Sequence, residues 1–500
     1  MFPEQTLQKE VSGPYTFFSR NALTILFLCI LVFVVVFSLS TLVTKPRLWT
    51  DEGTSIELAR NFAFSGKLDV EIGPGKFTGI ANLLQSTGYP VTVPLGLLFR
   101  GLGLDFSLAR LYMIGWMLLA ITAVYYLARK LFTPLHVVLA ILLIVTFASF
   151  YGSGRTVVGE IPGFMFLALG LYYWLHRRSY ELTGIFFGLA LVTKPSVFGL
   201  AALALFLVLL KEPRHYVHRA FKLLLGMLPA IFFWFVFVGK NPFSGELWSE
   251  IGAFYKNPYS GDIFSHIFSN LANFFHSSTL VYFSLLLCAL AYARIVIRTS
   301  ETRYWYDFVF LYTALAFLYY LRSPGWLRYI LIAELLILTT LPHALSLCHM
   351  AITEKYKLSF RKFNATAATV TVVAILAVAQ LVQYFTGANI YESDSDLRVV
   401  SYINETFPKE SIAVFDAVTI AALIPNEQRY QTLTDSVIPV SAFHSLFFND
   451  SPLSLEPLPG VVVAQIGRQF SPADAAIIEK SYALNYEANH YNVYLRRNGF

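Results

Sequence analysis

The feature that most constrains the fold is a series of apolar runs of membrane length. Residues 22–43 contain no charged side chain, and a helix needs about 20 residues to cross the hydrocarbon core of a bilayer. Apolar runs recur along the chain at 22–44, 107–128, 134–151, 161–176, 180–193, 195–210, 220–239, 277–293, 304–321, 327–347 and 363–386. Only 14% of the 500 residues are charged, against about 25% in soluble domains. Residues 1–386 are therefore predicted to form an all-α polytopic membrane domain.

The run 89–104 is ambiguous because it is short and carries Pro90 and Pro94. Loops on the cytoplasmic side of a membrane are enriched in Lys and Arg. If 89–104 does not cross, the basic residues of the other loops fall on one side: Lys9, Arg20, Arg129, Lys130, Arg177, Arg178, Lys211, Arg214, Arg219, Lys222, Arg294, Arg298, Arg303, Lys355, Lys357, Arg361 and Lys362. This rule favours eleven spans, within a range of 11–13, with 89–104 as a re-entrant or interfacial helix and the N-terminus cytoplasmic.

The same topology brings a set of ionisable residues to the exoplasmic face. They are Asp51 and Glu52 of "WTDEG", Arg155 and Glu160 of "GSGRTVVGEIPG", Lys194 of "LVTKPSV", and Arg322 and Arg328 of "RSPGWLRY". Ionisable groups at membrane depth are costly and tend to be functional. Their convergence predicts a site at this edge of the membrane.

Residues 387–500 differ in composition and are predicted to form a small exoplasmic α/β domain. Helices are expected at 397–406 and from Ser471, where Ser caps the helix and Pro472 occupies its first position. Strands are expected at 411–416, 460–467 and 492–497. This tail contains no glycine-rich phosphate-binding motif, so no nucleotide is assigned to it.

Charge and cysteine content exclude other classes of function. The net charge of +6 comes from short basic clusters between apolar runs, which is a membrane pattern and not a nucleic-acid-binding one. All three cysteines fall inside apolar runs, so they predict neither a disulfide framework nor a metal site.

Five motifs in order resemble a known superfamily. They are "WTDEG" (49–53), "YPVTVPLG" (89–96), "GRTVVGEIPGFMFLALGLYYW" (154–174), "GLALVTKPSVF" (188–198) and "GWLRYILIAELLIL" (325–338). Together with the topology, they resemble the GT-C integral-membrane glycosyltransferases over roughly residues 20–350. The most similar branch contains the dolichyl-phosphate-mannose–protein mannosyltransferases and the lipid A aminoarabinose transferases.

The resemblance implies transfer of a sugar from a polyprenyl-phosphate carrier to an acceptor outside the cytoplasm, with inversion at the anomeric carbon. By the pattern of the family, Asp51 is the catalytic base and Glu160 matches a second acidic position. The aminoarabinose transferases carry a Glu-Lys-Pro-Pro element. In this chain, Lys76 is the residue matched to the lysine of that element. The sequence leaves the acceptor open among an envelope glycan, a lipid and a protein, and the expected compartment is the inner or plasma membrane.

The chemistry of such a transfer explains these residue types. A carboxylate takes the proton of the acceptor hydroxyl, and cationic groups stabilise the phosphate that departs. Lys194, Arg155 and Arg328 are the predicted phosphate-binding residues, with Glu52 as a further substrate contact. No cofactor is firmly implied, although a divalent metal with His266 as a ligand is one hypothesis.

Each residue also has a purely structural interpretation. Asp51 is a candidate N-cap for an interfacial helix at 53–65, and Glu52 and Glu160 are acids of a first helical turn. Arg155 and Arg328 are candidate interfacial residues whose charged heads reach water.

Three other functions compete with this interpretation. The first is a flippase or transporter of lipid-linked sugars, favoured by the break at Lys194-Pro195. The second is an oligosaccharyltransferase, which is disfavoured because the tail contains no Trp. The third is an assembly protein without catalysis, which the retained charged residues disfavour.

Overall fold

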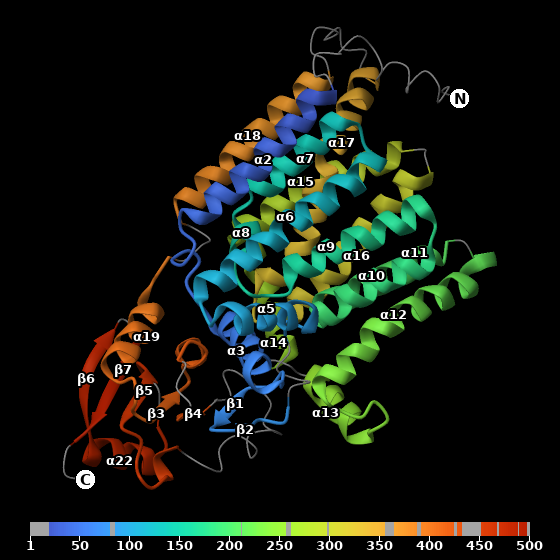
Figure 1. Ribbon diagram of the computed structural model, residues 1–500. Coiled ribbons are helices and arrows are strands. Elements are labelled where there is room, and N and C mark those ends of the chain that lie inside the picture. The colour runs from blue at the N-terminus through green and yellow to red at the C-terminus, as the bar shows by residue number, and fades with distance from the viewer. Residues whose placement is uncertain are drawn as a thin grey trace.

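The computed structural model describes residues 20–80, 86–211, 213–256, 262–297, 300–355, 365–387, 392–424, 428–432, 452–467, 470–488 and 490–497. These ranges form a long helical bundle with a smaller sheet domain at one end (Figure 1). We call this end of the bundle the domain end. Of the basic residues named above, Lys9, Arg298, Lys357, Arg361 and Lys362 lie outside the described residues.

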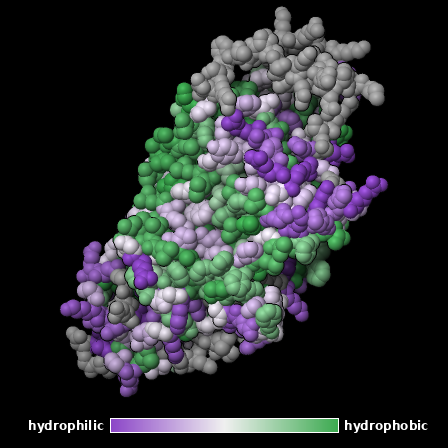
Figure 2. Space-filling view, turned by 45° about the vertical axis from the view of Figure 1, so that its right-hand side comes forward, coloured by the Kyte–Doolittle hydropathy of each residue, from purple (hydrophilic) through white to green (hydrophobic). Residues whose placement is uncertain are grey.

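Within the described residues, every predicted apolar run contains a helix. The helices of the bundle are α2 (Arg20–Leu39), α6 (Phe106–Leu131), α7 (Pro134–Thr146), α8 (Ala148–Gly154), α9 (Glu160–Tyr172), α10 (Tyr180–Thr193), α11 (Pro195–Leu209), α12 (Tyr216–Val238), α15 (Ser278–Val296), α16 (Ser300–Arg322), α17 (Leu331–Lys355) and α18 (Ala365–Phe385). Large apolar side chains such as Val32, Phe232 and Ile375 point outward from the bundle. Figure 2 shows apolar side chains over its flank and hydrophilic ones towards its two ends, as a membrane-embedded bundle requires.

Among the described helices, six are long and apolar enough to span a membrane, namely α2, α6, α12, α15, α17 and α18. The pair α7 and α8, bent by 67°, adds a seventh if it counts as one broken span. Helices α10 and α11, with 14 and 15 residues, are the short pair predicted around Lys194-Pro195. The chain is thus a multi-pass membrane protein, and the prediction of eleven crossings stays a prediction.

A layer of short elements covers the domain end of the bundle. It contains α3 (Thr50–Ser65), the hairpin β1 (Glu71–Gly73) and β2 (Lys76–Phe77), α5 (Tyr89–Leu102), α13 (Gly245–Lys256) and α14 (Ile263–Ala272). Helix α5 is the ambiguous run, and it has 14 residues with Pro94 inside. At about 1.5 Å per residue it is too short to cross a bilayer. It packs against α3 at the domain end (Figure 1), as expected of an interfacial helix.

The C-terminal domain is the predicted α/β unit. Its sheet has the order β4-β3-β5-β7-β6, in which β3 is parallel to β4 and β5 while β7 is antiparallel to β5 and β6. The elements are α19 (Ser395–Thr406), β3 (Ile412–Phe415), α20 (Val418–Ala421), β4 (Arg429–Thr432), β5 (Val461–Gln465), α22 (Pro472–Ser481), β6 (Tyr482–Ala488) and β7 (Tyr491–Arg496). Ser471 caps α22 as predicted, whereas β4 and β6 were not predicted. The domain boundary at 386/387 stays a prediction.

The two faces of this sheet pack against different partners. Ile412, Val414 and Val461 share a buried apolar cluster with residues of α3, α5 and α6. Ala413 and Val462, on the opposite face, pack with residues of α22. Because successive strand residues point to opposite faces, one face of the sheet packs against the domain end of the bundle. The C-terminal domain and α3 therefore share a core.

Two glycines allow three loops to meet at the break between α10 and α11. A Cβ on Gly88, which precedes α5, would lie 1.8 Å from the carbonyl oxygen of Val192. A Cβ on Gly159, which precedes α9, would lie 2.4 Å from the carbonyl oxygen of Thr193. The Gly88 N–H donates to this same Thr193 carbonyl at 3.0 Å. The starts of α5 and α9 are thus fixed on the backbone beside Lys194.

This close approach predicts that Gly88→Ala destabilises the protein by about 1–3 kcal/mol, since overpacking displaces the start of α5. Gly115→Ala is the matched control, because a Cβ there meets nothing within 4 Å and alanine is the better helix former. Thermal unfolding of the detergent-purified protein measures both. A Gly88→Ala midpoint equal to that of the wild type would contradict the packing described for this junction.

Candidate active site

Four charged residues from separate elements meet at the domain end. Asp51 is the second residue of α3, and Arg328 lies in the 3₁₀ turn Leu327–Tyr329 that precedes α17. Arg328 donates through a terminal guanidinium nitrogen to Asp51 Oδ2 at 2.5 Å. Lys194 stands between α10 and α11, and its Nζ lies 3.4 Å from Oε1 of Glu160, the first residue of α9. We call these residues the charged quartet.

The two ion pairs act on one another. Burial alone would raise the pKa of Asp51, but Arg328 and then Lys194 attract its negative charge and hold the pKa below the ordinary value of 3.8. Burial would likewise lower the pKa of Arg328, but Asp51, Tyr329 and Glu160 raise it. Each cation therefore acts on both carboxylates, and Asp51 is ionised at neutral pH.

Aromatic rings fix the position of Arg328. Its guanidinium carbon lies 4.7 Å from the ring centre of Trp326, 4.8 Å from that of Trp49 and 5.5 Å from that of Tyr329. A cation within about 6 Å of a ring centre is attracted by the ring's quadrupole. Trp49 immediately precedes α3, so it and Asp51 hold Arg328 together.

The quartet has a buried side and a more open side. The side chains of Lys194 and Glu160 are 3% and 1% exposed, whereas those of Arg328 and Asp51 are 18% and 24% exposed. Among the described residues, two buried polar atoms of the quartet have no hydrogen-bond partner, Nε of Arg328 and Oε2 of Glu160. Buried polar atoms are normally satisfied. One unsatisfied donor and one unsatisfied acceptor in the same cluster suit a polar ligand.

The structure separates the functional and structural interpretations of these acids. The N-cap of α3 is Trp49, and no side chain caps that helix, so Asp51 is not the N-cap. The helix begins at Thr50, three residues before the predicted start at 53. Glu160 does open α9, as its structural interpretation requires, and it also pairs with Lys194. Its catalytic role stays a prediction.

Glu52 is bound by protein groups at both carboxylate oxygens, and its predicted substrate contact stays a prediction. It is fully buried, and Arg110 of α6 donates to both of its carboxylate oxygens, at 3.1 and 2.9 Å. The backbone N–H of Val157 adds a third donor at 3.3 Å. Successive residues of a helix point about 100° apart, which places Glu52 against α6 while Asp51 faces Arg328. Glu52 is therefore a structural tie between α3, α6 and the loop before α9.

Arg155 is likewise held by protein groups, and its predicted phosphate contact stays a prediction. It is fully buried and donates to the backbone carbonyl of Ser38 and the hydroxyl of Thr41. A further donor reaches the hydroxyl of Tyr384 in α18 at 3.0 Å. The guanidinium thus links the ends of α2 and α18, and its Nε is buried with no hydrogen-bond partner among the described residues.

Neither of the remaining candidates joins the quartet. Lys76 is exposed on the β1–β2 hairpin, which packs beside Glu57, about 9 Å along α3 from Asp51 by helical rise. His266 lies in α14. Within the described ranges, no group of three or more His, Cys, Asp or Glu residues could hold a metal ion. The hypothesis that His266 binds a metal gains no support.

Sequence reasoning missed Trp49 and Arg110. The role of Arg110 could have been predicted, because an arginine within the apolar run 107–128 needs a buried partner. Glu52 at the membrane edge was a candidate for that partner. Trp49 directly precedes Asp51, but nothing in the sequence shows that its ring lies on Arg328.

Comparisons with known proteins identify the fold. Residues 97–238, from within α5 to the end of α12, match the model of the dolichyl-phosphate-mannose-protein mannosyltransferase family. No curated protein matches the sequence significantly. Among solved structures, ArnT from Cupriavidus metallidurans bound to undecaprenyl phosphate superposes with a TM-score of 0.63 and 13% identity, covering 96% of this chain and 99% of that one.

Two further structures share the architecture. The apo state of the same ArnT gives a TM-score of 0.61 at 13% identity, covering 95% of this chain and 98% of that chain. The apo Archaeoglobus fulgidus oligosaccharyltransferase gives 0.51 at 12% identity, covering 97% of this chain and 75% of that chain. The protein is thus a membrane protein with the GT-C glycosyltransferase fold. Within that class, residues 97–238 are similar to the protein mannosyltransferase family.

The Glu52–Arg110 tie generates a stability prediction. Glu52→Ala leaves Arg110 buried without its partner and should cost about 3–5 kcal/mol, whereas the double variant Glu52→Leu/Arg110→Met removes both charges and should recover most of this loss. Thermal unfolding in detergent measures the difference. Glu181→Ala, which breaks an exposed pair with Lys222, is the control and should cost about 0–1 kcal/mol. A Glu52→Ala protein as stable as this control would contradict the assigned role.

Proposed function

We propose that the protein is an inverting glycosyltransferase that moves a sugar from a polyprenyl-phosphate donor to an acceptor on the exoplasmic side of the inner or plasma membrane. The observation that carries this proposal is the charged quartet, in which an ionised carboxylate and two cations meet at one end of a membrane bundle. The GT-C fold supports it, as does the ArnT structure, which contains undecaprenyl phosphate.

Asp51 is the general base of the proposed reaction. The oxygen of the acceptor hydroxyl attacks the anomeric carbon, and the bond from this carbon to the phosphate oxygen breaks. The electron pair of the broken bond leaves with the phosphate, and the hydroxyl proton passes to Asp51. Asp51 Oδ2 accepts a hydrogen bond from Arg328, while Oδ1 accepts none from the described residues and is the oxygen assigned to the acceptor.

Arg328 and Lys194 stabilise the departing phosphate. Its negative charge grows as the glycosidic bond breaks, so fixed cations favour the transition state over the ground state. The unsatisfied Nε of Arg328 supplies a donor for a phosphate oxygen, and the buried Lys194 adds a second positive charge behind it. Glu160 keeps Lys194 in place, and its unsatisfied Oε2 can accept from a sugar hydroxyl.

A cavity in the bundle supports a donor with a hydrocarbon tail. A volume of about 450 Å³ lies between α15, α16 and α17, and most of its lining residues are apolar. The lining includes Ile330, two residues from Arg328, and a single acid, Glu334. A lipid whose phosphate rests on Arg328 has this apolar space within reach of its first carbon atoms.

The position of the quartet argues against a transporter. Many secondary transporters place their substrate sites near the bilayer midplane, at the interface between internal repeats. The quartet residues lie instead at the starts of α3 and α9, at the α10–α11 break and before α17. This arrangement fits surface chemistry on a lipid headgroup.

Asp51→Asn should lower the kcat of sugar transfer by about 100-fold or more, because the amide cannot accept the proton. The assay uses detergent-purified protein, a panel of radiolabelled polyprenyl-phosphate sugars and membrane extracts as acceptor. Asp105→Asn is the matched control, since Asp105 is exposed and caps α6 and asparagine is an equally good cap. Full transfer by Asp51→Asn would remove the assignment of the base.

The pH dependence of kcat/KM tests the pairing with Arg328. Since Arg328 and Lys194 hold the pKa of Asp51 below its ordinary value, the wild-type rate should not fall through loss of the base between pH 7 and about pH 4. In Arg328→Gln, burial is opposed by Lys194 alone, so the pKa of Asp51 rises and the acid limb moves to higher pH. An acid limb that stays in place in Arg328→Gln would contradict this electrostatic account.

A further inference from the structure

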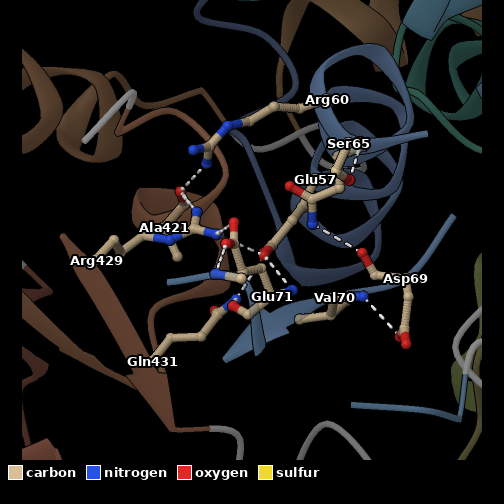
Figure 3. A network of polar contacts seen from close by, with 11 residues as sticks. Glu57, Arg60, Ser65, Asp69, Val70, Glu71, Ala421, Arg429 and Gln431 are labelled. Carbon is tan, nitrogen blue, oxygen red and sulfur yellow. Dashed lines mark hydrogen bonds and ion pairs between the residues drawn. The ribbon is translucent and has the colours of Figure 1, made fainter. Parts of the chain in front are cut away.

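A buried polar network joins α3 to strand β4 of the C-terminal domain (Figure 3). Its centre is Glu57, which is fully buried and whose Oε1 accepts from the Arg429 guanidinium at 2.9 Å. Gln431 Nε2 donates to the same oxygen at 2.5 Å, and the backbone N–H of Glu71 donates to it at 3.2 Å. Side chains of β4 and the backbone of the β1–β2 hairpin thus converge on one carboxylate of α3.

Two more contacts hold α3 against α20, which precedes β4. Arg60 and Arg429 both donate to the backbone carbonyl of Ala421, and in Figure 3 these two guanidinium groups approach it from α3 and from β4. Closer to the start of α3, a Cβ on Gly53 would lie 3.0 Å from the backbone of Thr419. The C-terminal domain therefore contacts α3 at positions 53, 57 and 60.

These contacts lie on the helix that carries Asp51. Glu57 follows Asp51 by six residues, a rise of about 9 Å, and Gly53 follows it by two. A helix transmits displacement along its axis because its turns are rigidly hydrogen-bonded. A shift or rotation of α3 at Glu57 would therefore move Asp51 relative to Arg328, which belongs to the separate turn before α17.

We propose that Arg429 is a positioning residue for the transfer reaction, which fixes α3 through Glu57 so that Asp51 meets Arg328 in the geometry needed for catalysis. The inference rests on the proposed function, because it assigns Asp51 to the reaction. This role of the C-terminal domain does not require a contact between the domain and the substrate.

The chemistry of the contact distinguishes it from ordinary packing. The surrounding interface is an apolar core shared by α3, α5, α6 and the sheet, and apolar residues would fill it at lower cost than a buried ion pair. The Glu57–Arg429 pair instead defines the orientation of α3, because hydrogen bonds from Arg429 and Gln431 to one oxygen fix the rotation and register of this helix.

Four variants of the full chain test this role. They are Arg429→Gln, Arg429→Lys, the double variant Glu57→Gln/Arg429→Gln, and the control Arg398→Gln, which breaks an exposed pair with Asp394 in the same domain. The readouts are kcat and the donor KM, the thermal midpoint, and hydrogen exchange of the backbone over residues 50–65, which requires no substrate.

Arg429→Gln should lower kcat by about 10- to 100-fold, as a misplaced catalytic group does, while the donor KM changes by less than about twofold. Exchange over 50–65 should rise. Arg429→Lys keeps a positive charge against Glu57 and should recover part of the rate. The double variant removes the unpaired buried carboxylate, so its thermal midpoint should return towards the wild-type value while kcat stays low. Arg398→Gln should behave as the wild type in all readouts.

Three outcomes would overturn the proposal. The first is a folded Arg429→Gln or double variant with wild-type kcat. The second is a double variant in which stability and kcat recover together, which would make the pair merely structural. The third is unchanged exchange over 50–65. A wild-type protein that transfers no sugar would instead overturn the proposed function, and an active wild type with an equally active Arg429→Gln would overturn the positioning role alone.

Discussion

The ion pair between Asp51 and Arg328 is the contact on which the rest of the site depends. It joins α3, which lies across the domain end of the bundle, to the turn that opens α17, a membrane span. Charges at the edge of a bilayer are costly unless they are paired. The Lys194–Glu160 pair lies beside the Asp51–Arg328 pair, and the four residues form a cluster of balanced charge. This cluster still contains an unsatisfied donor and an unsatisfied acceptor. A ligand that carries an anion and hydroxyl groups matches what this cluster lacks.

Three acidic residues of helix α3 each form an ion pair with a different arginine. Asp51 faces Arg328, Glu52 faces Arg110 in α6, and Glu57 faces Arg429 in β4. The helix is therefore held by the membrane bundle on one side and by the C-terminal domain on another, and its acidic start is presented between them. The bundle and the C-terminal domain thus both support α3. Under the proposed function, a domain without a nucleotide-binding motif contributes to catalysis through this helix.

The sequence alone predicted the helical runs and the convergence of Asp51, Glu160, Lys194 and Arg328, because hydropathy and the distribution of basic residues determine which loops share a face. It could not separate the residues of that face by role. Arg155 and Glu52 had the same apparent position as the quartet, but whether a side chain turns into the core or towards the ligand depends on packing between distant segments. For the same reason, the contact of Arg429 could not be predicted, since its partner Glu57 lies more than 370 residues away in the chain.

The most direct test of the account is a structure of the protein with bound polyprenyl phosphate, determined in lipid nanodiscs by cryo-electron microscopy. The account predicts that the phosphate lies within hydrogen-bonding distance of Arg328 and next to Lys194, with the first isoprene units entering the cavity between α15, α16 and α17. A phosphate bound away from the quartet, for example at Lys76 on the β1–β2 hairpin, would contradict it.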